Sequence, residues 1–469
     1  MSLPANRSTL ICIAALLLLW QAADAVDLPA SYALAGGLNG GLSWAPSDYR
    51  CDDCNVILIS IDTLRQDHVG AYGYEHDTTP NIDSFAAESV QFDHAIAMAP
   101  STLPSHASIF TSMIPEHHRA FRSTERPLPD EAVTMAEILF RAGYRTGGFT
   151  AGAQMHEKYN VDQGFDVYDS FEQEMTHESR FSDIVAKGKD FLEEHGDEQF
   201  FLFLHTYEVH TPYTPPPEYL QAFDPDYDGD LGDEITLQYL RSVFENPVRL
   251  RVSEKDQRHI VAAYDGEIRN MDAAFGDLVA YLRERDLYDN TLIVFTSDHG
   301  EEFGERGRHG WHSWTLYDEL LTVPLLIKLP GSRYGGRTVG EVARGIDLLP
   351  TMVDLLDIDT TQPFEGTSLM DRVLNRRTDV VFAVSQRDYA GTLPTSIRTA
   401  RWKLYDGALY DLAADPIERH DVSAEHPHVR AALDANLAVI RSHSALSDAD
   451  PIELDEALRR ELRDLGYIQ

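Results

Sequence analysis

Runs of hydrophobic residues alternate with amphipathic segments along most of the chain. Four runs have the continuous apolar character of strands that are buried on both faces of a sheet. They occupy residues 55–62, 199–207, 291–300 and 323–331. Between them, residues 181–196 and 265–286 place apolar side chains at helical spacing. This alternation predicts an α/β domain with a large, mostly parallel sheet and helices on both of its faces.

The pattern changes after about Thr378, where the elements become shorter. Three strand-like pieces, VVFAVS, SIRTARWKLYDG and ALYDLA, are followed by one amphipathic segment, VRAALDANLAVIRSH. This order predicts a small C-terminal α+β subdomain with one closing helix, packed on the main sheet.

The first residues predict export. They combine one Arg, an apolar run from Leu10 to Trp20 and the small-residue triplet Ala23-Asp24-Ala25, which are the features of a signal peptide cleaved after Ala25. The apolar run is short for a transmembrane helix, so an uncleaved anchor is the weaker alternative, and no later segment is apolar enough to span a bilayer. We therefore expect a periplasmic or secreted protein. Its expected parts are a signal peptide at 1–25, a leader or linker at 26–54, a large main domain at 55–377 and the small subdomain at 378–469.

The composition is strongly acidic. Among 469 residues, 77 are Asp or Glu and 39 are Lys or Arg, which gives a formal charge of -38. Such a surface argues against nucleic acid and anionic membranes as partners, and a site for an anionic substrate needs positive charge of its own. After loss of the signal peptide, which contains Cys12, the two cysteines left are Cys51 and Cys54, and they could form a local disulfide in an oxidising compartment. They precede a predicted strand, so we expect no redox role.

Acidic and histidine side chains gather at the ends of the predicted strands. Asp62 ends the first run, and Asp298 and His299 end the run that begins at Thr291. His205 ends a third strand, and His210 lies in the loop beyond it. In open α/β sheets, ligands bind beyond the carboxyl ends of the strands. Because a buried carboxylate is costly unless it is paired or bound to a metal, these residues predict a metal site.

The stretch APSTLPSHASIFTS, residues 99–112, places Thr102 where a turn opens a short apolar helix. Two interpretations compete. Thr is a good helix cap, and most Thr residues in this position do only that. Alternatively, a metal held by Asp62, Asp298 and His299 could bind the Thr102 oxygen and activate it as a nucleophile, with the helix N-terminus favouring an incoming anion.

Motifs along nearly the whole mature chain carry a resemblance to a known family. In order, they are NVILISIDTLRQDHVGAYGY, TTPNIDSFAAESVQFDHA, STLPSHASIFTS, AGYRTGGF, GFDVYD, FLFLHTYEVHTPY, NTLIVFTSDHGEEFGE, HSWTLYDELLTVPLLIKLPG, GIDLLPTMVDLL, EGTSLMD and LYDLAADPIERHDV. Between residue 55 and about residue 425, the chain resembles the sulfatase family of the alkaline-phosphatase superfamily. The resemblance implies a metal-dependent ester hydrolase on an alkaline-phosphatase-like fold.

The departures from the sulfatase pattern are at the proposed nucleophile and its surroundings. Sulfatases convert a Cys or Ser in C/S-x-P-x-R to formylglycine, whereas this chain has Thr102 in the first place and His106 in the last. Thr cannot become formylglycine, so none is expected. Thr63 stands where sulfatases have a second Asp, and Asp298-His299 replaces their Asp-Asn pair.

The altered set resembles the phospho-transfer relatives of the family instead. These are lipoteichoic acid synthases, phosphoethanolamine transferases and one half of the two-metal site of nucleotide phosphodiesterases, in which Thr forms a phospho-enzyme beside manganese or zinc. The resemblance implies one divalent ion bound by Asp62, Thr102, Asp298 and His299. A His ligand favours manganese or zinc over calcium or magnesium. A second ion is not expected, because no Asp stands four residues before His210.

Further histidines match substrate-facing positions of the family. By the same resemblance, His210 and His312 are the candidates for a general acid that protonates the departing ester oxygen, and His309 competes with His312 for that role. His106 and His205 are candidate substrate-binding or orienting residues. Each of these histidines also has a purely structural interpretation.

The sequence thus leads to one main hypothesis and two alternatives. The main hypothesis is an exported metallohydrolase in which Thr102 attacks a phosphate, phosphonate or sulfate ester and forms a covalent Thr ester that water or an alcohol releases. The substrate is an anionic ester on a small molecule, a glycan or a lipid headgroup. The first alternative is an inactive sulfatase-fold protein that binds sulfated or phosphorylated glycans. The second, true sulfate-ester hydrolysis by Thr, is chemically awkward because no gem-diol can form.

Overall fold

The computed structural model describes residues 50–121, 125–170, 180–245, 252–376, 380–389, 392–465 and 467. The predicted signal peptide, most of the predicted leader and the predicted boundary between residues 377 and 378 lie outside these residues. Within the described part of the chain, no helix has the length and apolar character needed to cross a membrane.

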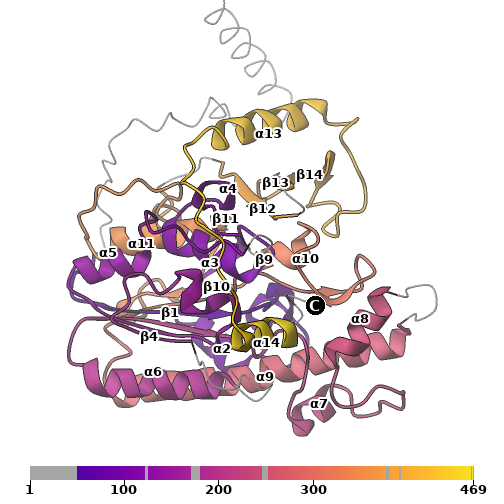
Figure 1. Ribbon diagram of the computed structural model, residues 1–469, viewed down its shortest axis with the longest axis horizontal. Coiled ribbons are helices and arrows are strands. Elements are labelled where there is room, and N and C mark those ends of the chain that lie inside the picture. Colours follow the sequence, from indigo (N-terminus) through magenta and orange to yellow (C-terminus); the bar gives the residue numbers. More distant parts are fainter. Residues whose placement is uncertain are drawn as a thin grey trace, which may run out of the picture.

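A nine-stranded sheet forms the centre of the main domain (Figure 1). Its strand order is β11-β2-β10-β6-β1-β5-β3-β4, and β9 pairs with β2. Most neighbours are parallel, while β10 runs antiparallel to both β2 and β6, and β9 runs antiparallel to β2. The strands are β1 (Asn55–Ile61), β2 (Val90–Ile96), β3 (Arg145–Phe149), β4 (Val167–Asp169), β5 (Phe200–Thr206), β6 (Thr291–Thr296), β9 (Thr322–Val323), β10 (Leu325–Lys328) and β11 (Arg337–Arg344).

Helices cover both faces of this sheet, which confirms the predicted α/β class. Figure 1 shows α6 and α9 side by side along one face and α3, α5 and α11 on the other. The central strands are apolar along their whole length because both faces are covered, and every residue of β1, β5 and β6 is buried. The helices of the main domain are α2 (Pro80–Ala86), α3 (Thr102–Thr111), α4 (Pro115–His118), α5 (Met135–Arg141), α6 (Phe181–His195), α7 (Pro217–Phe223), α8 (Leu237–Glu245), α9 (Glu254–Glu284), α10 (Asp318–Leu321), α11 (Leu348–Leu355) and α12 (Met370–Val373).

Helix α9 is longer than its sequence pattern predicts. The apolar stripe predicts a helix over 265–286, but the helix begins at Glu254, because the Ser253 side chain caps it by accepting a hydrogen bond from the Asp256 N–H. The stripe itself is buried as expected, and it includes Met271 and Phe275.

The C-terminal region forms a small antiparallel sheet in the order β12-β13-β14-β15. Its strands are β12 (Ala383–Gln386), β13 (Thr395–Arg398), β14 (Trp402–Tyr405) and β15 (Ala408–Asp411), and α13 (Pro427–Ile440) packs against it. This arrangement agrees with the strand-like pieces and the closing helix that the sequence predicts. After α13, the chain returns across the main domain and ends in a second helix, α14 (Glu456–Asp464), which the sequence reasoning missed (Figure 1).

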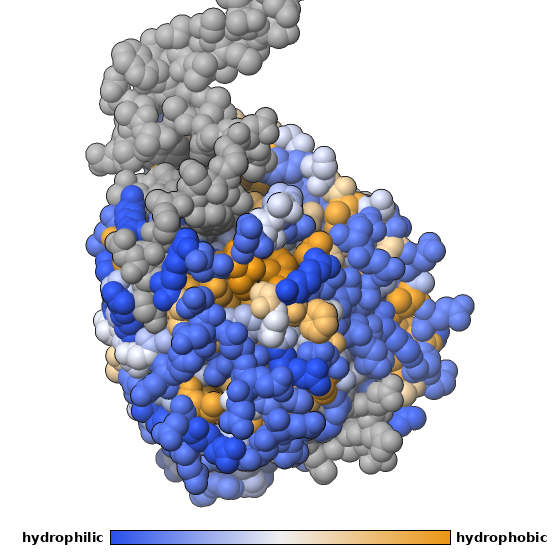
Figure 2. Space-filling model, turned by 90° about the vertical axis from the view of Figure 1, so that its left-hand side faces the viewer, coloured by the Kyte–Doolittle hydropathy of each residue, from blue (hydrophilic) through white to orange (hydrophobic). Residues whose placement is uncertain are grey.

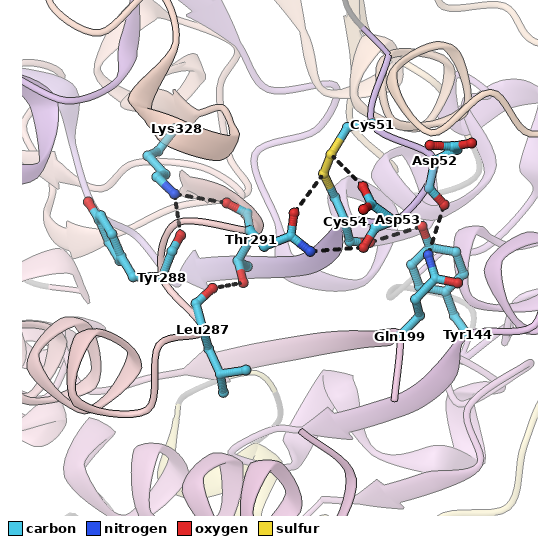
Figure 3. Close-up of a disulfide and its surroundings, with 11 residues drawn as sticks. Cys51, Asp52, Asp53, Cys54, Tyr144, Gln199, Leu287, Tyr288, Thr291 and Lys328 are labelled. Atoms are coloured by element: carbon cyan, nitrogen blue, oxygen red, sulfur yellow. Dashed lines mark hydrogen bonds between the residues drawn. A yellow bond between two sulfur atoms is a disulfide. The ribbon is translucent and has the colours of Figure 1, made fainter. Parts of the chain in front are cut away.

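Cys51 and Cys54 form a disulfide just before β1 (Figure 3). Side chains from the loops that enter β3 and β6 fix this turn: the Tyr144 hydroxyl donates to the Cys54 carbonyl at 3.0 Å, and Asn290 Nδ2 donates to the Asp53 carbonyl at 2.9 Å. Because β1, β3 and β6 enter the sheet from the same side, the disulfide lies at the edge opposite their carboxyl ends. Its surroundings agree with a structural role.

The surface reflects the acidic composition. The face in Figure 2 is covered mainly by hydrophilic residues, with hydrophobic residues gathered in a band across its middle. The buried side chains instead form one large apolar core, which includes Phe92, Phe201 and Phe295 from three strands of the main sheet.

Candidate active site

The carboxyl ends of the central parallel strands bring the predicted metal ligands together. Asp62 directly follows β1, and Asp298 and His299 follow β6, the parallel neighbour of β1. One ligand atom from each of these three residues lies within 4.8 Å of the other two, and all three side chains are completely buried. The strand-end argument therefore places the three residues in contact, as the sequence predicts.

Thr102 belongs to the same cluster and does not cap its helix. It is the first residue of α3, and the N-cap position is held by Ser101. The Thr102 hydroxyl donates a hydrogen bond to Asp62 Oδ2 at 3.0 Å and lies 2.8 Å from the hydroxyl oxygen of Tyr467. The next backbone amide of the helix, the Leu103 N–H, donates its hydrogen bond to Gln154 Oε1 at 2.9 Å. The cap interpretation of the Thr102 side chain is therefore excluded by its contacts.

Asp62, Asp298 and His299 have the donor set of a divalent metal site. Three of their buried atoms, Asp62 Oδ1, Asp298 Oδ2 and His299 Nε2, find no hydrogen-bond partner among the residues that the structure describes. His299 Nδ1 donates to the Gly300 carbonyl at 2.9 Å, which leaves the lone pair of the neutral imidazole on Nε2. These orphaned atoms fit a divalent cation, since buried polar atoms normally have partners.

The electrostatics of the carboxylate pair support the same conclusion. Burial and the adjacent Asp298 raise the pKa of Asp62 well above its usual value. Burial alone would also raise the pKa of Asp298, but the imidazoles of His299, His106 and His205 outweigh it and lower that pKa to about 2. Two carboxylates this close, fully desolvated, are a poor arrangement by themselves. A cation between them would allow both to be ionised.

A second cluster with metal-type donors lies beside the first. Ligand atoms of His210, Glu301 and His312 lie within 4.8 Å of one another, and the His299 and His312 rings are 4.6 Å apart between centroids. His210 Nδ1 donates to the Thr211 carbonyl, so its Nε2 carries the lone pair. His210 Nε2 and Glu301 Oε1 have no hydrogen-bond partner within the described ranges. This trio could hold a cation or move a proton.

Burial sets the charge of this second cluster. It lowers the pKa of His210 to about 3, with further lowering by the neighbouring His312. It also raises the pKa of Glu301, whose other oxygen accepts a hydrogen bond from the Tyr213 hydroxyl. His210 is therefore neutral at ordinary pH, and its Nε2 is placed to accept a proton.

His106 contacts Thr102, and His205 lies beside His106 and Asp62. His106 is fully buried, with Nδ1 2.9 Å from the Thr102 carbonyl oxygen and Nε2 2.9 Å from Ser60 Oγ. Its ring meets that of His205 edge to face, at 4.9 Å between centroids. His205 Nε2 is in turn 3.5 Å from Asp62 Oδ2. Both residues thus contact the cluster from the core side.

His309 is the one candidate placed elsewhere. It belongs to β8 (His309–Trp311), which pairs with β7 (Glu302–Phe303), and its ring packs against the turn at Gly304. Burial lowers the pKa of His309, and the smaller effect of the nearby Glu305 carboxylate opposes this shift. Among the described residues, His309 thus packs within the hairpin and belongs to neither of the two clusters.

Sequence reasoning missed two residues of the site. Glu301 is the third residue after Asp298, in the run Asp-His-Gly-Glu-Glu, where an acidic residue this close to predicted ligands was a usable signal. Tyr467 is separated from Thr102 by 365 positions and is brought there by α14. No local pattern signals that contact.

The sheet, its helices and the strand-end cluster define an alkaline-phosphatase-like fold with a buried hydroxyl among metal-type ligands. The profile of the Sulfatase family matches residues 54–358, and that of the C-terminal region of N-sulphoglucosamine sulphohydrolase matches residues 307–443. The chain therefore belongs to the sulfatase family.

Relatives and solved structures agree with this assignment. The chain is 26% identical over 425 residues to an ulvan-active sulfatase of Formosa agariphila, with 82% of this chain and 80% of the relative covered. It is 26% identical over 385 residues to an arylsulfatase of Clostridium perfringens, with 69% and 79% covered. The phosphonate monoester hydrolase of Agrobacterium radiobacter shares the fold, with a TM-score of 0.67, 23% identity, and 83% of this chain and 95% of that one covered.

Proposed function

We propose that this protein is an exported, metal-dependent ester hydrolase that uses Thr102 as a covalent nucleophile, with phosphate diesters and phosphonate monoesters as its preferred substrates. One observation carries the proposal: the Thr102 hydroxyl makes its hydrogen bond to Asp62 Oδ2, inside the buried cluster with Asp298 and His299, and not to its own helix. A hydroxyl that only capped a helix would bond to the backbone of the first turn.

The cluster would hold one divalent cation through Asp62, Thr102, Asp298 and His299. The imidazole favours manganese or zinc, while calcium and magnesium fit the two carboxylates. A cation bound there would lower the pKa of the Thr102 hydroxyl and stabilise the negative charge that develops on the substrate oxygens.

The first half-reaction needs an oriented nucleophile and a proton for the leaving group. Asp62 Oδ2 holds the Thr102 hydroxyl by its hydrogen bond and is the nearest acceptor for its proton. As Thr102 Oγ1 bonds to phosphorus, the bond from phosphorus to the leaving alcohol breaks, and that oxygen takes up a proton. We assign His312 as the donor.

The second half-reaction releases the Thr ester. Water attacks phosphorus, the Oγ1–phosphorus bond breaks, and Thr102 regains the proton that Asp62 accepted in the first half-reaction. We assign His210 as the base that accepts the water proton, because its Nδ1 donates to the Thr211 carbonyl and its Nε2 carries the lone pair. The His210 and His312 rings are 4.9 Å apart between centroids, so the proton taken by one can restore the other.

Sulfate esters are the second candidate substrates, because both curated relatives named above are sulfatases. Thr102 argues against them. Without formylglycine, the enzyme must release a stable Thr sulfate by attack of water. A phosphoryl group has a more accessible hydrolytic route, which is why we place phosphate and phosphonate esters first.

A small panel of aryl esters tests the proposal. Mature protein loaded with manganese or zinc is assayed on an aryl sulfate, an aryl phosphate diester and an aryl phosphonate monoester. Thr102→Ala should lower turnover of the phosphorus esters by roughly three orders of magnitude or more. Thr111→Ala is the matched control, since Thr111 lies in the same helix and its hydroxyl donates to the Ala107 carbonyl.

Mass spectrometry of acid-quenched enzyme adds a readout that does not depend on rate. A phosphoryl group on the Thr102 peptide is expected with wild-type protein. Turnover that survives Thr102→Ala would remove Thr102 from the mechanism. A protein that turns over none of the esters, yet binds sulfated or phosphorylated glycans with equal affinity before and after the substitution, would identify a binding protein.

A further inference from the structure

The last described residue of the chain lies in the active site. The Tyr467 hydroxyl oxygen is 2.8 Å from Thr102 Oγ1, and only 7% of Tyr467 is exposed. Its ring packs against two histidines of the second cluster, with centroids 5.5 Å from His210 and 5.6 Å from His312. A C-terminal residue thus touches both the proposed nucleophile and the proposed acid and base.

Helix α14 holds Tyr467 in this position through specific contacts. Glu461 Oε2 accepts a hydrogen bond from the Ala153 N–H at 3.0 Å, in the short 3₁₀ helix η5 (Ala153–Met155). The adjacent Gly152 has φ +73°, and a Cβ there would lie 3.0 Å from Glu461 Oε2, so glycine permits this close approach. Leu458 and Leu462 bury their side chains beneath the helix.

The segment on which α14 docks also contacts α3, the helix that begins at Thr102. Gln154, next to Ala153, binds the Leu103 N–H at the start of α3. At the other end of α14, Lys158 pairs with Asp455, the N-cap residue. The backbone N–H of Tyr467 then donates to the Leu462 carbonyl at 2.7 Å, which turns the chain toward the site.

The direction of the hydrogen bond follows from the donors present. Thr102 has one hydroxyl hydrogen, and it is directed to Asp62 Oδ2. Tyr467 is therefore the donor to Thr102 Oγ1. When Oγ1 is part of an ester it has no hydrogen and can only accept a hydrogen bond, so the contact with Tyr467 then requires the Tyr467 hydroxyl as the donor.

We infer that Tyr467 is a catalytic residue whose hydroxyl donates a hydrogen bond to Thr102 Oγ1 when that oxygen leaves phosphorus in the second half-reaction. The inference rests on the proposed function, since it requires a Thr102 ester. As water attacks and the Oγ1–phosphorus bond breaks, the electron pair goes to Oγ1, and the donor stabilises the developing charge. In this inference the main domain supplies Thr102 and the two histidine-containing clusters. The C-terminal segment that follows α14 supplies the hydroxyl group that completes the active site.

Tyr467→Phe tests this role, because it keeps the ring and removes only the hydroxyl. With an activated aryl phosphodiester, we expect a burst of about one aryl alcohol per active site, followed by a steady rate roughly 100-fold lower than wild type. Acid-quenched Tyr467→Phe should carry more phosphorylated Thr102 than wild-type protein. Tyr144→Phe is the matched control, since it removes a buried hydroxyl at the disulfide edge.

Three other results would overturn the inference. Wild-type kinetics without accumulation of phosphorylated Thr102 in Tyr467→Phe would leave Tyr467 a structural residue. A lower rate without a burst would place its effect before the ester forms. Faster turnover by Tyr467→Ala would show that the Tyr467 side chain obstructs the active site. Failure of the proposed function looks different, because Thr102 would then not be phosphorylated in any of the proteins.

Discussion

His106 supports Thr102 from below, with its Nδ1 2.9 Å from the Thr102 carbonyl oxygen inside the fully buried first turn of α3. It stands where the formylglycine signal of sulfatases has Arg. In this chain the position is enclosed by Ser60 on β1, by Phe110 on α3 and by Phe203 on β5. The replacement therefore changes a buried contact of Thr102 and not an exposed surface.

Restoring the sulfatase residue by His106→Arg should destabilise the protein. The longer side chain overfills a closed space, and we expect a loss of about 1–3 kcal/mol in the free energy of unfolding. Its positive charge, near Asp298, should also weaken cation binding. Urea denaturation and metal titration measure the two effects. His106→Gln, which keeps a donor for the Thr102 carbonyl, is the milder control, and unchanged stability of the Arg variant would contradict the packing argument.

The metal content distinguishes the two clusters. We expect one tightly bound divalent ion per chain, lost in Asp298→Asn and kept in His210→Ala, as measured by elemental analysis after dialysis. The reason is that Asp298 belongs to the carboxylate pair that most needs a cation. A second ion that disappears selectively in His210→Ala would show that the trio with Glu301 and His312 binds metal as well, against the single-ion proposal.

The cluster of Asp62, Asp298 and His299 could be predicted from the sequence because the sheet topology determines its geometry. Asp62 and Asp298 end neighbouring parallel strands, so buried apolar runs alone bring them to one edge. The strand-end ligands made Thr102 a candidate nucleophile, but a Thr at a helix start has the same sequence pattern whether or not it caps. The contact of its hydroxyl with Asp62 in the structure distinguishes the two.

The second cluster and Tyr467 show where such reasoning ends. The sequence analysis tested for a second set of ligands by the presence of an Asp four residues before His210. In the structure, the carboxylate that lies beside His210 and His312 belongs to Glu301, which follows a different strand. Helix α14 was missed since its exposed face is highly charged and few residues are apolar. Its function depends on where it docks, and docking is a tertiary property.

A compact ionic cluster around Asp318 joins helix α10 to the C-terminal sheet. Asp318 accepts hydrogen bonds from Arg398 Nη1 at 2.5 Å and from Lys403 Nζ at 2.7 Å, and Lys403 also pairs with Glu418. Arg398 is 3% exposed and Lys403 is completely buried. Asp318→Asn should lower the free energy of unfolding by about 3 kcal/mol, because it leaves buried cations short of a counter-charge. Urea denaturation measures the change, and Asp371→Asn, on α12, serves as a control.

The same cluster predicts a pH dependence of stability. Burial alone would raise the pKa of Asp318, but Arg398 and Lys403 outweigh it and hold that pKa well below its usual range. In the unfolded chain Asp318 takes up a proton near pH 4, whereas in the folded protein it stays ionised at lower pH. Its stabilising contribution is thus complete above that pH and is lost as the pH falls further. Asp318→Asn should flatten the acid limb of the stability curve, and an unchanged limb would show that other carboxylates control it.

Loss of the disulfide should affect stability and leave the chemistry intact. Cys51 and Cys54 close a very short loop, for which the chain-entropy estimate gives a stabilisation of about 2 kcal/mol. The loop is also held by hydrogen bonds from Tyr144 and Asn290, at the edge of the sheet opposite Thr102. The double variant Cys51→Ser, Cys54→Ser should therefore unfold at lower denaturant concentration, with unchanged turnover per folded molecule. Wild-type protein with a reducing agent should match it, and a fall in turnover beyond the loss of folded protein would show that this edge communicates with the active site.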